Sequence, residues 1–174
     1  MKKSVRQRIL SLVLYLCLAL LLAYVLFTKH ATTLEVGTKA PIEDLIRLQN
    51  GPVSFARLTK KVTVINFWAS WCHPCLSELP ILKDAAQRYS QVAFVGPLVG
   101  SNESLAELKS SFQIPYTIGH VDNNVSTQWH AQFLPTTYIL DSFGQILWAK
   151  AGAVDAAEFE QALKAAIKST ERKF

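Results

Sequence analysis

Charged positions divide the chain into an apolar N-terminal run and a mixed remainder. Residues Ile9 to Phe27 hold no charged side chain. A helix of this run, at about 1.5 Å per residue, would span about 28 Å, close to the ~30 Å hydrocarbon core of a bilayer. The basic residues before it should stay in the cytoplasm. We therefore predict a cytoplasmic segment at 1–8, a transmembrane anchor at 9–27, a linker at 28–40 and a folded domain at 41–170.

A cleaved secretory signal is the alternative to this anchor. Its apolar region would be shorter, and a small-x-small cleavage site would follow it. Tyr24 to His30 offers no such site, and Leu16 stands where a lipoprotein signal needs a small residue before Cys17. Within the run, Cys17 is interpreted as a small apolar side chain. Palmitoylation or intermolecular pairing of Cys17 stays open as an alternative.

The rest of the chain alternates between short β-branched runs and helical spacing. Strands are predicted at 62–68, 92–95, 117–121, 136–140 and 145–150, and helices at 72–90, 102–112, 124–132 and from Asp155 onwards. A turn at Leu48–Pro52 indicates an early hairpin, and Pro80 should kink the first helix of this region. This order predicts an α/β fold, a three-layer sandwich with a mixed sheet.

Composition narrows the class of protein. Half of the residues are hydrophobic and 18% are charged, so the chain has enough apolar material for a core. Of the 18 Lys and Arg residues, five lie in residues 1–30, where there is no acid, which leaves 13 bases against 13 acids in residues 31–174. The net charge therefore belongs to the N-terminus, and no nucleic-acid-binding face is expected.

The candidate chemistry lies at Cys72 and Cys75, between a predicted strand and a predicted helix. A thiol at a helix N-terminus faces unpaired N–H groups, which favour its thiolate. Thiol–disulfide exchange needs such a thiolate. A zinc site needs four ligands, and no second pair of metal ligands is spaced to complete one. A purely structural disulfide is disfavoured, because so short a loop restrains little of the unfolded chain.

The segment VINFWASWCHPCLSELP resembles the active site of thioredoxins. It is closer still to their membrane-tethered, extracytoplasmic branch, the TlpA-like or ResA-type thiol–disulfide oxidoreductases. The segment Leu134–Tyr138, with Asp141 and Gly144, looks like the PTT(F/Y)-x-x-D-x-x-G motif of that branch, and the resemblance covers about residues 37–168. It implies a thioredoxin-like fold, with Cys72 as nucleophile and Cys75 as resolving thiol. It also implies a cis-Pro135, which would expose the backbone of Leu134 to an extended substrate.

Five further side chains bear on the expected site. The branch carries an acid where Glu78 stands, which would accept the Cys75 proton; a solvated helix charge is the alternative. Asn66 replaces the buried acid of cytosolic thioredoxins, which gives Glu78 more weight. His73 would favour the Cys72 thiolate unless it is simply exposed. Pro74 would stiffen the helix start, and Trp71 would shape the rim of the site.

By resemblance, the expected function is the reduction of protein disulfides at the periplasmic or outer face of the cytoplasmic membrane, possible substrates including apocytochrome c. The expected partners are protein thiols and a membrane thiol donor of electrons, in a monomer with no metal and no cofactor beyond the Cys72–Cys75 disulfide. One alternative is the same chemistry run as an oxidase or isomerase. Another is a copper(I)-holding module. A peroxiredoxin is disfavoured, because Ala69 stands where its threonine would be.

Overall fold

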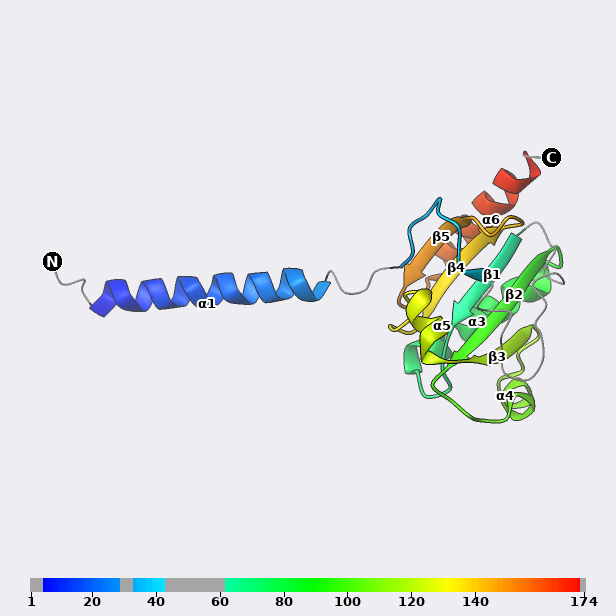
Figure 1. Cartoon of the computed structure of the whole chain (residues 1–174), viewed down its shortest axis with the longest axis horizontal. Helices are drawn as coiled ribbons and strands as arrows, with labels where there is room; N and C mark the ends of the chain where they lie inside the picture. Colours follow the sequence, from blue (N-terminus) through cyan, green and yellow to red (C-terminus); the bar gives the residue numbers. More distant parts are fainter. Residues whose placement is uncertain (1–4, 29–32, 43–61, 173–174) are drawn as a thin grey trace. The chain divides into compact units, whose positions relative to one another are not determined.

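The computed structural model describes residues 5–28, 33–42 and 62–172 (Figure 1). The chain divides into two compact units, residues 1–32 and residues 33–174. The turn expected at Leu48–Pro52 lies outside the described residues.

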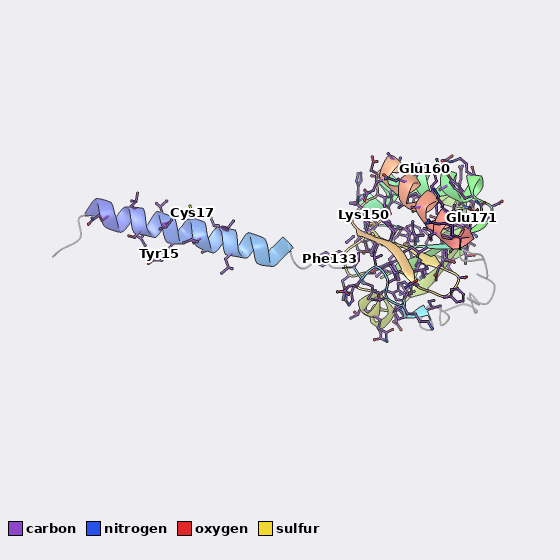
Figure 2. All side chains as sticks on the ribbon, turned by 90° about the horizontal axis from the view of Figure 1, so that it is seen from above. Tyr15, Cys17, Phe133, Lys150, Glu160 and Glu171 are labelled. Atoms are coloured by element: carbon purple, nitrogen blue, oxygen red, sulfur yellow. A yellow bond between two sulfur atoms is a disulfide. The ribbon has the colours of Figure 1, made fainter. Side chains whose placement is uncertain are left out.

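The first unit contains one helix, α1 (Val5–Thr28). The side chains of Tyr15 and Cys17 project from it (Figure 2), and the thiol of Cys17 is free. Leucines with more than half of their surface exposed lie along the same helix, including Leu10 and Leu20. Over the residues that the structure describes, no helix meets both the length and the apolar character required to cross a membrane. The anchor at 9–27 therefore stays a prediction.

The second unit is built on a five-stranded sheet in the order β3-β2-β1-β4-β5. Its strands are β1 (Val62–Phe67), β2 (Val92–Val99), β3 (Thr117–Val121), β4 (Thr136–Asp141) and β5 (Ile146–Ala151). The first three strands are parallel, while β4 and β5 join antiparallel. The mixed sheet of the sequence analysis is thus confirmed.

Helices cover both faces of this sheet. They are α3 (His73–Arg88), α4 (Leu105–Phe112), α5 (Asn123–Gln128) and α6 (Ala156–Glu171). On one face Val62 and Val64 pack with apolar residues of α3, α4 and α6. On the other, Ile65 and Phe67 pack with α5 and with Trp129. Since side chains alternate along a strand, β1 contributes side chains to the cores on both faces of the sheet. Asn66 lies on the face that α3 covers.

The starts of α5 and α6 agree with local sequence signals. Asp122 and Asp155 accept hydrogen bonds from the first turns of α5 and α6, as N-cap residues do. The helix α3 is continuous through Pro80. The predicted helix at 124–132 ends instead at Gln128, and Trp129 turns into the core.

Part of the predicted linker lies against the domain. The backbone N–H of Gly37 donates to the Ile146 carbonyl at 2.8 Å, and that of Ala40 donates to Gly144 at 2.9 Å. Ala40 is buried in the core that also contains Tyr138. The segment just before Pro41 therefore contributes to the fold rather than only connecting it to α1.

Candidate active site

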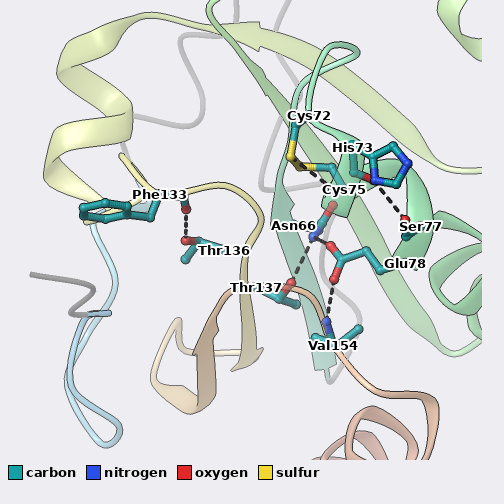
Figure 3. The surroundings of a disulfide bond; sticks show 10 residues. All are labelled: Asn66, Cys72, His73, Cys75, Ser77, Glu78, Phe133, Thr136, Thr137 and Val154. Carbon is teal, nitrogen blue, oxygen red and sulfur yellow. Dashed lines mark hydrogen bonds between the residues drawn. A yellow bond between two sulfur atoms is a disulfide. The ribbon is translucent and has the colours of Figure 1, made fainter. Parts of the chain in front are cut away.

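Cys72 and Cys75 form a disulfide at the start of α3, with their Cα atoms 5.3 Å apart (Figure 3). Cys72 is the N-cap residue, and its sulfur accepts a hydrogen bond from the Cys75 backbone N–H at 3.3 Å. Pro74 lies in the first turn, where the missing N–H of a proline costs no helix bond. The first sulfur thus lies at the positive end of the helix, where a thiolate is stabilised.

The rim of the site on the Trp71 side combines an exposed aromatic ring with polar side chains. Trp71 is 67% exposed although it is a large aromatic residue. A groove of about 510 Å³ is lined by Trp71, by Leu108 and Phe112 of α4, and by polar residues that include two glutamates. His73 is exposed, and its backbone carbonyl accepts a hydrogen bond from the Ser77 hydroxyl at 3.0 Å.

The Leu134–Pro135 peptide bond is cis, as expected from the sequence. Pro135 immediately precedes β4, whose first residue, Thr136, pairs with Phe67 at the end of β1. Because the turn that contains Cys72 follows the end of β1, the cis proline and the disulfide lie at the same end of the two paired strands. Leu134 packs against the core cluster that includes both cysteines.

Glu78 is buried, with only 1% of its surface exposed. This excludes the alternative of a solvated helix charge. Its Oε1 accepts a hydrogen bond from Asn66 Nδ2 at 2.7 Å, and its Oε2 accepts one from the Val154 backbone N–H at 2.7 Å (Figure 3). Glu78 lies three residues after Cys75 on α3, so the two Cβ atoms are about 5–6 Å apart. The structure therefore brings a buried carboxyl group close to the second cysteine.

Burial raises the pKa of Glu78 from its ordinary value of 4.5 to about 7. Desolvation is the largest cause, since it penalises the charged carboxylate. The hydrogen bonds from Val154 and Asn66 and the positive charge of Lys150 act in the opposite direction. With its pKa near neutrality, the carboxyl group can both accept and release a proton under physiological conditions.

Two groups that act on Glu78, Val154 and Lys150, and the Thr137 hydroxyl that bonds to Asn66 were not predicted from the sequence. Thr137 accepts a second hydrogen bond from Asn66 Nδ2 at 2.9 Å, and Lys150 lies opposite Thr137 in the sheet. Val154 is far from the cysteines in the sequence. One sequence signal pointed to this network: the side-chain alternation of β1 places Asn66 on the face that α3 covers.

In the part of the chain that the structure describes, no group of three His, Cys, Asp or Glu side chains is arranged to hold a metal ion. Ala69 is fully buried before the disulfide. At the site itself, the groups that can take part in chemistry are the two sulfurs and the buried carboxyl group.

Comparison with known proteins extends these observations. A family model described as the AhpC/TSA family matches residues 36–149. The thiol-disulfide oxidoreductase ResA of Geobacillus kaustophilus is 27% identical over 173 residues, covering 94% of this chain and 98% of that protein. The thiol:disulfide interchange protein DsbE of Allochromatium vinosum is 29% identical over 168 residues, covering 90% of each.

Solved structures give the same fold. A thiol:disulfide interchange protein of the thioredoxin family from Chlorobium tepidum superposes with a TM-score of 0.58 at 25% identity. The match covers 67% of this chain and 86% of that one. The sheet order, the disulfide at the start of α3 and the cis proline are thus found in a chain with a thioredoxin-like architecture.

Proposed function

The chain belongs to the AhpC/TSA family, and we propose that it is a membrane-tethered enzyme that reduces protein disulfides outside the cytoplasm. Its general activity, thiol–disulfide oxidoreduction, follows from the thioredoxin-like fold and from relatives with that name. The observation that carries the proposal is the placement of the buried Glu78 carboxyl group one helical turn from Cys75, behind a disulfide that caps α3.

The reaction uses the two sulfurs in sequence. In the reduced enzyme, the Cys72 thiolate attacks a substrate disulfide, forms a mixed disulfide and releases one substrate thiolate. Cys75 then loses its proton to the Glu78 carboxylate and attacks Cys72. The Cys72–Cys75 disulfide forms, and the second substrate sulfur leaves. Two electrons pass to the substrate, whose thiolates take up protons.

The surroundings of Cys75 favour the reductive direction. Stabilising a thiolate stabilises the reduced enzyme and makes its disulfide more oxidising. A carboxylate one turn from Cys75 destabilises the Cys75 thiolate, and so makes the disulfide less oxidising. His73 is exposed to solvent, which weakens any electrostatic support that it gives to Cys72. The start of α3 stabilises the Cys72 thiolate and acts in the oxidising direction, so the buried carboxyl group beside Cys75 is the feature that supports a reductase over an oxidase.

The remaining parts of the proposal concern location and partners. The uncharged run Ile9–Phe27, preceded by basic residues, supports an N-terminal anchor in the cytoplasmic membrane with the domain on the periplasmic or outer side. A membrane thiol carrier would then return electrons to Cys72 and Cys75. Apocytochrome c is a candidate substrate by family resemblance, and the enzyme is expected to act as a monomer.

Trapping experiments test the proposed reaction. The full chain in detergent carries Cys75→Ser, with Cys72→Ser as the matched control, and each reduced variant is mixed with insulin. We expect a covalent complex with Cys75→Ser, because Cys72 attacks but is not resolved, and none with Cys72→Ser. Equal trapping by both variants, or by neither, would contradict the assigned order of the two sulfurs.

Membrane extraction tests the anchor. The full chain should remain in the membrane pellet after washing with alkaline carbonate, while a chain lacking residues 1–30 should not. Release of the full chain by the wash would reject residues 9–27 as an anchor, whatever the result of the trapping experiment.

A further inference from the structure

The two oxygens of Glu78 have partners of different kinds. Oε2 faces the backbone N–H of Val154, which can only donate a hydrogen bond. Oε2 must therefore accept whether the carboxyl group is charged or neutral. When Glu78 takes up a proton, that proton belongs on Oε1, the oxygen that faces Asn66.

Asn66 presents a donor to that oxygen in the present state. Its Nδ2 group donates to Glu78 Oε1 at 2.7 Å and to Thr137 Oγ1 at 2.9 Å. If Oε1 carried a proton directed at Asn66 and Asn66 did not move, two donors would face each other inside the core, where an unsatisfied polar group is destabilising. Asn66 is only 3% exposed, so water has little access to replace the lost bond.

An asparagine side chain can resolve this conflict by itself. A half-turn about its Cβ–Cγ bond exchanges the NH₂ group for the carbonyl oxygen, which accepts where the amide had donated. The Thr137 hydroxyl can follow, because it both accepts and donates. After the turn, the Glu78 hydroxyl donates to Asn66 Oδ1, and so does Thr137.

We propose that Asn66 is a reversible amide switch, a positioning residue that turns over when Glu78 Oε1 gains or loses the Cys75 proton. The inference rests on the proposed function for the source of that proton. As Cys75 attacks Cys72, the Cys75 S–H bond breaks and an O–H bond forms on Oε1. The switch keeps Glu78 hydrogen-bonded on both oxygens before and after this transfer.

Other charged or titratable groups near Glu78 do not supply this second arrangement. Lys150 on β5 acts on the carboxylate through its charge. Tyr116, just before β3, is buried, and its pKa is raised by desolvation and by the negative charge of Glu78. Cys75 is the proton donor on the same helix. Asn66 is the one direct partner described for Glu78 whose side chain holds both a donor and an acceptor.

Nuclear magnetic resonance of the oxidised full chain in detergent micelles tests the switch directly. The side-chain amide protons of Asn66 are followed together with the Glu78 carboxyl carbon between pH 5 and pH 9. We expect both signals to change with one midpoint, near the Glu78 pKa of about 7. Below the midpoint, the contacts between the Asn66 amide protons and Thr137 should disappear. Contacts that persist through the titration would overturn the proposal.

Two variants separate a switch from a purely structural role. In Glu78→Gln, the side-chain NH₂ group needs an acceptor from Asn66, so the amide should hold the turned orientation at every pH. In Asn66→Leu, the midpoint of Glu78 should rise, because the charged carboxylate loses the stronger hydrogen bond. An unchanged midpoint would contradict the role of Asn66. None of these readouts needs substrate, so a failed switch and a failed reductase are distinguishable.

Discussion

The carboxylate of Glu78 accepts a hydrogen bond of 2.7 Å from the backbone N–H of Val154, which lies 76 residues further along the chain. This bond joins α3, the helix that begins at the disulfide, to the segment between β5 and α6. It also stabilises the charged form of a group that burial drives toward its neutral form. The proton affinity of the site therefore depends on the tertiary fold, and not on the cysteine motif alone.

Replacing Glu78 by Gln should stabilise the oxidised protein in a pH-dependent way. The folded-state pKa of about 7 lies above the ordinary value of 4.5, so wild type loses stability as the pH rises through this window. The loss amounts to about 3 kcal/mol above pH 7, at 1.36 kcal/mol per pKa unit. Urea unfolding at pH 4.5 and pH 8 measures the difference. Glu107→Gln, at an exposed position, is the matched control, and equal gains at both pH values would refute this origin of the effect.

Replacing Lys150 by Met should raise the pKa of Glu78 further. Lys150 favours the charged carboxylate through its positive charge, although it also pairs with Glu158. Titration of the Glu78 carboxyl carbon by nuclear magnetic resonance should therefore show a higher midpoint than in wild type. Lys164→Met removes a cation that pairs with Glu160 on α6 and serves as the control. A lower or unchanged midpoint in Lys150→Met would show that this charge does not act on Glu78.

Replacing Trp71 by Ala should weaken substrate binding without weakening the fold. Its side chain is 67% exposed, so truncation removes little core contact. It offers an aromatic surface to a protein substrate beside the disulfide, and such residues dominate many interfaces. We expect KM for insulin to rise about tenfold, a loss of about 1.4 kcal/mol, with the unfolding midpoint unchanged. Phe143→Ala, in the turn between β4 and β5, should leave KM as in wild type. If both variants behave alike, Trp71 is not a substrate contact.

The sequence predicted the fold well because the strands of this chain are short, apolar and separated by helical spacing. The strand predicted at 92–95 is shorter than β2, because Gly and Pro are uncommon inside strands and Gly96 and Pro97 follow directly. The strand continues to Val99, and the Pro97 carbonyl still accepts a hydrogen bond from the Trp68 backbone N–H at 3.1 Å. Local propensity could not predict this hydrogen bond, because the bond depends on the pairing of β2 with the end of β1.

The site divides in the same manner. Cys72, Cys75 and the cis Pro135 lie in sequence motifs, so their positions could be predicted. Glu78 was singled out, but its burial could not be decided from one helix alone. Its bonds to Asn66 and Val154 join three separate elements, and no local pattern relates them.

Replacing Gly96 by Ala should destabilise the domain. A Cβ atom there would lie 3.0 Å from Ile118 and 3.0 Å from Trp68 Nε1, which donates to the Gly96 carbonyl at 3.3 Å. Such overpacking typically costs about 1–3 kcal/mol. Thermal unfolding measures the loss. Trp68→Phe removes the Nε1 atom, so the double variant should lose less than the sum of the single variants. If the losses of the two single variants simply add, the contact with Trp68 Nε1 is not the source of the strain.

The reduction potential of the Cys72–Cys75 pair tests the central claim most directly. The full chain in detergent is equilibrated with dithiothreitol or glutathione buffers, and the fraction of disulfide is measured at pH 7. A reductase supplied with electrons from the membrane should give a value near or below about −270 mV, the level of thioredoxin. A value toward about −120 mV would identify a disulfide donor and contradict the proposed direction.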